Sequence, residues 1–264
     1  MRDHSRLKDV TFLWTIVMET NENRTGNYTF TIIVPVYNEE ENIGRLEDKL
    51  RDFLPQSLYK TAVLFVNDGS IDESGKRIRE VCERNSAFFY LDLQENGGLS
   101  AALKAGFDYC FSEYTGYMDA DMQTDAEDFN LLLPHLDTHE FVTGIRADRK
   151  DSFFKNLQSK IANGYRRMMT GDGVADTGCP LKVMQTKYAK RIPMFNGMHR
   201  FLPALILLQN GRIRQVPVRH YPRLAGKSKY HLWNRLSGPF IDCFAYRWMK
   251  KRYINYQISS SNLD

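Results

Sequence analysis

Carboxylate side chains follow a short apolar segment near the middle of the chain, and their spacing suits metal chemistry. Asp119 and Asp121 come directly after residues 114–118 and lie two positions apart, so an extended or turning backbone can aim both at one hard cation. Oxygen ligands of this kind favour Mg²⁺ or Mn²⁺ over zinc. Asp-x-Asp is also common in turns, where the carboxylates only satisfy backbone donors. The pair alone therefore leaves a metal site and a plain turn as alternatives.

Strand-like segments must position these carboxylates. Strand and helix patterns alternate five times, with the strands at residues 29–36, 62–66, 88–93, 114–118 and 141–145. Since right-handed crossovers place a helix between neighbouring parallel strands, this alternation predicts an α/β fold with a mostly parallel, doubly wound sheet. Ligands bind beyond the carboxyl ends of such strands, so Asp68 and Asp119 are expected to face one ligand.

Further elements are expected around this sheet. Asn38 is a suitable N-cap for the first helix, and Asp125 is a suitable N-cap after the acidic cluster, which removes Asp125 from the metal site. Helices are expected at residues 153–169 and 198–209, and a further strand at residues 214–219.

The composition is that of a folded protein, with 264 residues of which 42% are hydrophobic. No apolar run approaches the ~20 residues needed to cross a bilayer and no signal-peptide pattern opens the sequence, so we expect a protein that neither spans a membrane nor is secreted. Its four cysteines lack zinc or disulfide spacings, which fits a reducing cytoplasm. The net charge is only +4, yet residues 212–252 carry eleven Lys or Arg and one acid. No nucleic-acid-reading motif accompanies this charge, so nucleic acid is not an expected partner.

Three regions are expected along the chain. Residues 1–28 carry no motif and are expected to be an N-terminal extension, in which Met18 is an alternative start. Residues 29–222 are expected to form the main domain. Residues 223–264 are expected to form a basic lid loop followed by an amphipathic segment.

Four motifs lie at the ends of the expected strands, at residues 34–40 (VPVYNEE), 66–72 (VNDGSID), 96–98 (NGG) and 118–123 (MDADMQ). In that order and spacing, over about residues 29–252, the chain resembles the inverting family 2 glycosyltransferases, which have a nucleotide-sugar-binding sheet of GT-A type (Rossmann-like). Within them it resembles the polyprenyl-phosphate glycosyltransferases, the group of dolichyl-phosphate mannose synthase and the undecaprenyl-phosphate formamido-arabinose transferase. Residues 197–203 and 223–230 also resemble bacterial members of that group.

The resemblance implies a donor site for a nucleotide sugar, with UDP as the expected nucleotide. Asp68 would read the edge of the base, and Asp119 would contact the ribose and the metal zone. Asp121 and Gln123, with Asp119 beside them, would ligate an Mg²⁺ or Mn²⁺ ion that bridges the diphosphate. One departure is Glu95, because relatives often have a basic residue there. The expected donor-binding residues are Pro35, Tyr37, Glu39, Asp68, Asn96 and Asp119.

A second set of residues is mostly basic and suits phosphate groups. Arg146 follows the fifth strand, where a guanidinium fork can bind phosphate oxygens in a bidentate way. The resemblance points to the same residue and to Lys160. His199 and Arg200 are candidates for holding the diphosphate, with capping or packing as the alternative role. The expected catalytic residues are Asp119, Asp121 and Arg146, and the expected phosphate contacts are Arg146, Lys160, His199, Arg200, Arg223, Lys227, Ser228 and Lys229.

The resemblance implies metal-dependent, inverting transfer of a sugar to a polyprenyl (undecaprenyl) phosphate. A phosphate monoester with a second pKa near ~6 is already largely dianionic at neutral pH, so no general base is assigned. The alternative is a family 2 transferase acting on a hydroxyl of a glycan or lipopolysaccharide, which would require a base such as Asp176. A non-catalytic nucleotide-sugar-binding protein is a further alternative, against which the intact Asp119, Asp121 and Gln123 argue.

The last part of the chain combines aromatic and basic residues. Apolar and aromatic residues alternate there with basic ones, namely Leu232, Trp233, Leu236, Phe240, Phe244, Tyr246 and Trp248 with Arg235, Arg247, Lys250, Lys251 and Arg252. Rings and cations together suit the headgroup level of a bilayer, and the alternative is a C-terminal helix packed on the body of the protein. We therefore expect a peripheral enzyme on the cytoplasmic side of the cell membrane, with an integral-membrane protein as a candidate partner.

Overall fold

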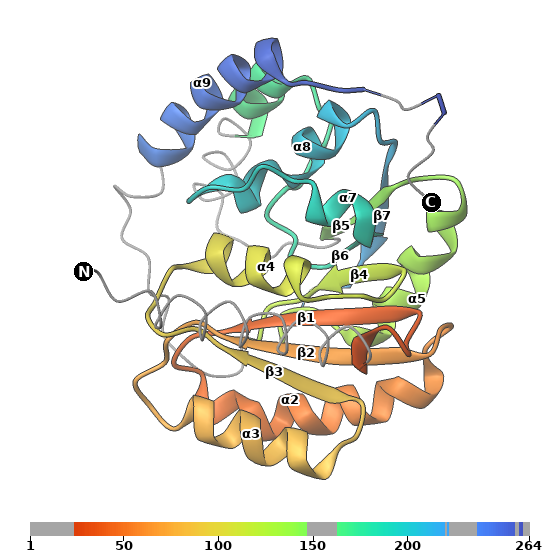
Figure 1. Ribbon diagram of the computed structural model, residues 1–264, viewed down its shortest axis with the longest axis vertical. Helices are drawn as coiled ribbons and strands as arrows, with labels where there is room; N and C mark the ends of the chain where they lie inside the picture. The colour runs from red at the N-terminus through yellow and green to blue at the C-terminus, as the bar shows by residue number, and fades with distance from the viewer. Residues whose placement is uncertain (1–23, 147–162, 220, 222–236, 257–258, 261–264) are drawn as a thin grey trace, which may run out of the picture.

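The centre of the molecule is a seven-stranded sheet (Figure 1). The computed structural model describes residues 24–146, 163–219, 221, 237–256 and 259–260. The strands are β1 (Phe30–Val36), β2 (Thr61–Asn67), β3 (Phe88–Asp92), β4 (Tyr114–Tyr117), β5 (Phe141–Arg146), β6 (Lys182–Gln185) and β7 (Ile213–Val218). Their order is β3-β2-β1-β4-β6-β5-β7, and among these strands only β6 runs antiparallel to its neighbours. The expected mostly parallel α/β sheet is therefore confirmed.

Helices cover both faces of this sheet. In Figure 1, α2 and α3 lie on one side of the sheet, α4, α7 and α8 lie on the other, and α9 lies outermost beyond α8. Residues 163–170 are also helical. The α-helices are α2 (Glu40–Phe53), α3 (Ser74–Arg84), α4 (Leu99–Asp108), α5 (Phe129–Leu132), α7 (Thr186–Lys190), α8 (Leu202–Leu208) and α9 (Ser237–Arg252). The 3₁₀ turns are η1 (Leu54–Gln56), η2 (Ala126–Asp128), η3 (Leu133–Asp137) and η4 (Met198–Phe201).

The sheet separates two apolar clusters. All seven residues of β2 are buried, and the five between its polar ends, residues 62–66, are all apolar, as a strand covered on both faces requires. On one face Phe30 packs edge-on against Phe129 of α5, with ring centroids 5.2 Å apart. On the other face Phe201 stacks near Tyr246 of α9, at 6.2 Å. Burying a side chain of this size contributes roughly 1.5–3 kcal/mol, so α9 is held to the body by one of its faces.

Strand β6 is an element that the sequence did not predict. It has only four residues and begins with a lysine, so neither an apolar run nor an alternating pattern marks it. It lies between β4 and β5, with Tyr117 paired to Lys182 and Thr143 paired to the same lysine. The end of β5 is therefore two strands away from β4, about 10 Å at the usual strand spacing.

The two predicted helix caps had opposite outcomes. The cap at Asn38 is wrong, because α2 begins at Glu40 and Asn38 has a left-handed backbone with φ of 51°. Its side-chain oxygen instead accepts a hydrogen bond from the backbone N–H of Ile71 over 2.9 Å. The cap at Asp125 is confirmed, since its carboxylate accepts from the backbone N–H of Glu127 at the start of η2.

The described end of the N-terminal region packs on the main domain. Thr25 is buried, and its hydroxyl accepts from the backbone N–H of Phe111 over 3.1 Å. The ring of Tyr28 lies edge-on to Phe89, with centroids 5.9 Å apart. The boundaries at residues 28 and 222 stay predictions. Within the part of the chain that the structure describes, no helix is both long and apolar enough to cross a bilayer.

Candidate active site

Three neighbouring strands end at one edge of the sheet. Strand β1 lies between β2 and β4 and is parallel to both, with Val36 paired to Asn67 and Ile33 paired to Tyr117. Asp68 and Asp119 follow the two outer strands of this trio, so they come from strands about 10 Å apart. The predicted meeting of these strand ends at one edge is confirmed, with the end of β1 between the two aspartates.

The loops after β1 and β2 are joined by hydrogen bonds. The backbone N–H of Asn38 donates to Oγ of Ser70 over 3.0 Å, and the backbone N–H of Glu39 donates to Oγ of Ser74 over 2.8 Å. These bonds fix the first loop against the second. They hold three half-buried residues that were expected to line a base pocket, namely Pro35, Tyr37 and Glu39.

Asp68 binds the loop after β3 with both carboxylate oxygens. Its Oδ1 accepts from the backbone N–H of Gly97 over 2.8 Å, and its Oδ2 accepts from Gly98 N and Asn96 Nδ2, each over 2.9 Å. Burial raises the pKa of Asp68, while the two backbone donors oppose that rise. A carboxylate has about four acceptor positions, so these three bonds leave about one for a further N–H.

Gly69 permits the contact between these two loops. Its φ is +64°, in the left-handed region that favours glycine. A Cβ at this position would lie 2.5 Å from the backbone nitrogen of Asn96 and 2.5 Å from the carbonyl carbon of Glu95. The Asp-Gly step after β2 is therefore required for Asp68 to reach its partners, and the exposed Glu95 enters this contact through its backbone.

The acidic loop after β4 forms a tight turn. The carboxylate of Asp121 is mostly buried and accepts from the backbone N–H of Gln123 over 3.2 Å. Met122 between them has a φ of +54°, while Asp119 and Gln123 are half-buried. The carboxylate of Asp121 therefore belongs to a turn, as the simpler interpretation predicted, and Asp119 lies two residues before it, just after the end of β4.

The donor set of this turn fits a hard cation. No group of three His, Cys, Asp or Glu side chains within the described ranges could hold a metal ion without other ligands. Mg²⁺ rarely uses an all-protein cage and is usually bound by one or two carboxylates together with substrate phosphates. Asp119, Asp121 and the amide oxygen of Gln123 match that pattern of ligands.

Arg146, at the end of β5, forms an ion pair with Asp176. Its Nε and Nη2 each donate to one carboxylate oxygen over 2.8 Å, and both side chains are largely buried. Asp176 also accepts from the backbone N–H groups of Arg146 (3.3 Å) and Gly178 (3.1 Å). The forked edge of Arg146 that was expected for phosphate thus binds this carboxylate.

Lys182 is a site-neighbouring residue that the sequence interpretation missed. Its fully buried ammonium donates to Oη of Tyr117 over 3.0 Å and to the carbonyl oxygens of Thr177 and Cys179. Burial lowers the pKa of Lys182, and the nearby negative charge of the Asp176 carboxylate opposes this shift. The available signal was a lysine between the apolar residues Leu181 and Val183.

His199 lies beside the start of α4. Its Nδ1 is 2.8 Å from Oγ of Ser100. Burial lowers the pKa of His199 to about 3, with the positive charges of Arg200 and Lys182 adding to the effect. His199 is therefore neutral at any physiological pH. Arg200 is half-buried and its charge acts on Asp242 of α9, whose pKa is raised by burial.

The residues that follow β7 return to the acidic turn. The backbone N–H of Tyr221 donates to the carbonyl oxygen of Gln123 over 2.9 Å. Just before it, Arg219 Nε donates to Asp128 over 2.9 Å. Five predicted phosphate contacts lie outside the described residues, namely Lys160, Arg223, Lys227, Ser228 and Lys229.

Comparison with known proteins identifies the family. The model for glycosyl transferase family 2 matches residues 31–192. The chain belongs to glycosyl transferase family 2. That range of the family 2 domain contains the turn after β4, the Asp68 loops and Arg146, whereas His199 and Arg200 lie beyond it.

Two relatives of this family 2 chain are named for polyprenyl phosphates. The dodecaprenyl-phosphate galacturonate synthase of Rhizobium johnstonii is 31% identical over 206 residues, covering 76% of this chain and 61% of that protein. The undecaprenyl-phosphate 4-deoxy-4-formamido-L-arabinose transferase of Edwardsiella ictaluri is 30% identical over 204 residues, covering 76% and 63%. The chain thus spans somewhat more than three fifths of the length of these relatives.

A solved structure shares the fold. Glucosyl-3-phosphoglycerate synthase from Mycobacterium tuberculosis, in complex with Mn²⁺, UDP and glucosyl-3-phosphoglycerate, superposes with a TM-score of 0.62 over 88% of this chain and 83% of that chain. The two sequences are 13% identical, so this likeness concerns the fold alone. The expected GT-A type of sheet is confirmed.

Proposed function

We propose that this protein transfers a sugar from a nucleoside diphosphate sugar to a polyprenyl phosphate, with inversion at the sugar. The proposal rests on one arrangement in a family 2 chain: Asp68 and the turn holding Asp119 and Asp121 flank the end of β1. The two relatives named for polyprenyl phosphates support the choice of acceptor.

Asp68 supports a donor whose base carries an N–H. The carboxylate already accepts three hydrogen bonds, and about one acceptor position is left. An acceptor of this kind matches the ring N–H of uracil, which favours UDP as the nucleotide. Asn96 would then act on the donor through Asp68, because its amide donates to that carboxylate.

A divalent cation would sit at the turn after β4. Asp121 and Gln123, with Asp119 beside them, would hold it, and Mg²⁺ or Mn²⁺ would suit these oxygen ligands. When bound, the cation would neutralise negative charge on the departing nucleoside diphosphate. The turn itself has a separate role, since its hydrogen bond between Asp121 and Gln123 N orients the carboxylate before any ligand arrives.

The acceptor phosphate requires no general base. In the proposed step, a dianionic phosphate oxygen forms a bond to C1 of the sugar while the bond from C1 to the diphosphate oxygen breaks and its electron pair leaves with the diphosphate. A hydroxyl acceptor would need a base, and Asp176 was the candidate. Its carboxylate already accepts four N–H bonds from Arg146 and Gly178, which argues against that role.

Arg146 would orient the acceptor end of the site. A guanidinium has five N–H donors, and Asp176 accepts from two of them on one edge of the side chain. This pairing locks the side chain against the end of β5, so the position of its positive charge is fixed. A guanidinium held in one place is better suited than the ammonium of a flexible lysine side chain to orient an incoming phosphate.

Helix α9 offers a surface for contact with the membrane. Its inner face packs on α8 through Tyr246, whose hydroxyl donates to the carbonyl oxygen of Ala204 over 3.2 Å. Its outer face exposes Phe240, Phe244 and Trp248, which recur every four residues and therefore share one side of the helix. We propose that this outer face, the aromatic face, meets the headgroups of the cytoplasmic leaflet.

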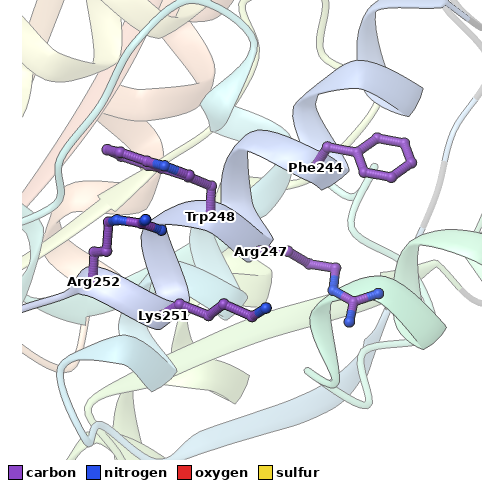
Figure 2. A pocket seen from close by; sticks show the side chains of 5 residues that line it. All are labelled: Phe244, Arg247, Trp248, Lys251 and Arg252. Atoms are coloured by element: carbon purple, nitrogen blue, oxygen red, sulfur yellow. The ribbon is translucent and has the colours of Figure 1, made fainter.

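Basic side chains surround the aromatic face. A hollow of about 340 Å³ is lined by five residues that all come from α9, namely Phe244, Arg247, Trp248, Lys251 and Arg252, whose side chains are drawn in Figure 2. The guanidinium of Arg252 lies over the ring of Trp248, 5.1 Å from its centroid. Rings that can enter the headgroup layer beside cations that attract anionic lipid suit a peripheral enzyme with a lipid acceptor. An integral-membrane protein is a further candidate partner for the same face.

Consumption of nucleotide sugars tests the catalytic role. Purified protein is incubated with a panel of nucleotide sugars, undecaprenyl phosphate and Mg²⁺ or Mn²⁺, and released nucleoside diphosphate is measured. We expect release only with both metal and acceptor, loss of release in Asp121→Asn, and near-normal release in the matched control Asp125→Asn. Release by none of the nucleotide sugars would favour a binding protein, and normal release by Asp121→Asn would remove the proposed metal role.

A further inference from the structure

Ser100 connects α4 with the loop that carries His199. Ser100 is the second residue of α4, two positions after Gly98, and it is buried. Its hydroxyl oxygen accepts from the backbone N–H groups of Gly197 (3.1 Å) and His199 (3.4 Å). The same oxygen lies 2.8 Å from Nδ1 of the His199 ring. Three polar groups of one loop therefore converge on a single hydroxyl.

The backbone of this loop is held from a second side. Gly197 has a φ of +89°, and a Cβ there would lie 2.6 Å from a carboxylate oxygen of Asp242 in α9. The loop is thus enclosed between Ser100 on α4 and Asp242 on α9. Because both sides are helices, the ring of His199 is attached to a rigid support.

The hydrogen bonds at Ser100 determine which ring nitrogen carries the proton. A serine hydroxyl has one donor hydrogen and two acceptor positions. The two backbone N–H groups occupy both acceptor positions, so the hydroxyl hydrogen must point to Nδ1 of His199. Nδ1 is then an acceptor, and in a neutral imidazole the proton is on Nε2. None of the described residues accepts a hydrogen bond from Nε2.

We infer that Ser100 is a positioning residue that holds His199 as the neutral tautomer with its proton on Nε2, so that His199 donates an N–H to a phosphate oxygen of the substrates. The choice of a phosphate oxygen rests on the proposed function, whereas the tautomer follows from the hydrogen bonds alone. In this state Nε2 has no lone pair to accept a proton. His199 is therefore a hydrogen-bond donor in the site and not a general base.

The charges around His199 favour this neutral state. Arg200 on the same loop and Lys182 on β6 both place positive charge near the ring, and the start of α4 contributes the positive end of its dipole. Asp242 of α9 is the acid next to this loop, and it faces Gly197 and Arg200. A neutral N–H in a positive environment attracts an anionic oxygen and does not need to change its protonation during the reaction.

Nitrogen NMR of the whole protein tests the tautomer without any substrate. The protein is labelled with ¹⁵N-histidine, and the His199 signals are assigned by their loss in His199→Gln, with His139→Gln, in the turn before β5, as a matched control. We expect one N–H signal at Nε2 and one unprotonated signal at Nδ1, unchanged between about pH 5.5 and 8.5. In Ser100→Ala the Nδ1 signal should move or the two tautomers should mix. A proton on Nδ1, or an imidazolium in this pH range, would overturn the inference.

Two substitutions of His199 test the donated hydrogen bond. His199→Gln can place an amide N–H near the position of Nε2, whereas His199→Asn places its amide near that of Nδ1. Since a hydrogen bond to a charged group is worth roughly 1.5–3 kcal/mol, we expect kcat/KM to be about 10-fold or more higher for His199→Gln than for His199→Asn. Equal activities would overturn the donor role, even if the NMR signals confirm the tautomer.

Titration of the labelled protein separates the two sources of phosphate. UDP with Mg²⁺ supplies the donor diphosphate, and undecaprenyl phosphate in detergent supplies the acceptor. A shift of the Nε2 signal with only one of them identifies the oxygen that is bound. No shift with either would contradict the role of His199 towards phosphate. If the wild-type protein also releases no nucleoside diphosphate, the proposed function fails and the tautomer is judged by the substrate-free spectra alone.

Discussion

Asp176 accepts hydrogen bonds from both Nε and Nη2 of Arg146, each over 2.8 Å, although the two residues are 30 positions apart in the sequence. This ion pair joins the end of β5 to the loop that precedes β6. It links a residue expected to bind the acceptor phosphate with the residue that a hydroxyl acceptor would need as a base. The pair therefore bears directly on the choice between the two acceptors.

Substitution of Asp176 distinguishes these acceptors. Asp176→Asn keeps the shape of the side chain and removes its charge, so Arg146 loses its partner and the free energy of unfolding should fall by about 1–3 kcal/mol. We expect kcat to fall less than about 10-fold with an unchanged pH profile, measured with saturating donor and acceptor. A general base contributes typically about 10²–10⁴-fold. A loss of that size, with the acidic limb of the pH profile removed, would favour the hydroxyl acceptor.

Asp68 should make donor binding sensitive to acid. Burial raises its pKa, so in the folded protein this carboxyl takes up a proton at a higher pH than an ordinary aspartic acid. Protonation removes an acceptor for the base, and donor affinity should fall as the pH drops towards this raised pKa. Acid affects stability in the opposite direction from donor binding, because the folded state holds the Asp68 proton more tightly than the unfolded state does. The contribution of Asp68 to the free energy of unfolding is therefore present at low pH and decreases as the pH rises above 3.8 and through the raised pKa of the folded state.

Calorimetric titration with UDP and Mg²⁺ between about pH 4.5 and 8 measures how donor affinity depends on pH. An ordinary aspartic acid has a pKa of about 3.9, below this interval, so a loss of affinity within it points to a carboxyl with a raised pKa. Asp68→Asn should weaken binding at every pH, since an amide nitrogen would face at least one of the N–H donors from residues 96–98. Asp72→Asn is a suitable control. Burial raises the pKa of Asp72, but hydrogen bonds from Ser74 and Glu40 lower it by more, so this carboxyl stays charged over the same pH interval. Donor affinity of the wild type that is independent of pH would argue against Asp68 as the base contact.

Lys182 should be required for the stability of the site. Lys182→Met removes the donor to Tyr117 Oη and to two carbonyl oxygens, and a buried polar group without a partner costs about 1–3 kcal/mol. We expect a lower midpoint of denaturant unfolding and a lower kcat, because the loop at residues 176–179 loses its support. The exposed Lys187 on α7 gives a matched control in Lys187→Met. Equal midpoints for the two variants would contradict this role.

The aromatic face of α9 should control binding to membranes. The double variant Phe244→Ala, Trp248→Ala should reduce binding to vesicles that contain anionic phospholipid by about 10-fold or more, given the apolar area that the two rings can bury. Leu58→Ala, also exposed but preceding β2 on the other side of the sheet, should have no effect. Binding should weaken as salt rises, because Arg247, Lys251 and Arg252 contribute charge. Cosedimentation measures this, and an unaffected double variant would rule out the aromatic face as the contact.

Much of the sheet could be predicted because its strands are apolar runs that end in polar turns. Strands β1 to β5 each have this pattern, and the resemblance of four motifs placed Asp68 and Asp119 at the correct edge. Strand β6 could not be predicted, because its lysine and glutamine interrupt any apolar pattern and its pairing with β4 and β5 is set by tertiary contacts.

The side-chain partners were harder to predict than the elements. Asn38 has the residue type of a helix cap, but the neighbouring loop supplies a better donor at Ile71 N. The pairing of Arg146 with Asp176, and of Ser100 with His199, joins residues far apart in sequence, and their local patterns carry no sign of it. Lys182 shows the same difficulty, because a lysine between the apolar residues Leu181 and Val183 suggests burial without indicating its partners.

The fate of the sugar tests the central claim most directly. Protein, Mg²⁺ or Mn²⁺, undecaprenyl phosphate and a panel of radiolabelled nucleotide sugars are incubated together, and the product is partitioned between an organic and an aqueous phase. The proposed function predicts that label from one nucleotide sugar enters the organic phase as a lipid-linked sugar, and that Asp121→Asn abolishes this transfer. Label that enters a water-soluble glycan and never the lipid would contradict it.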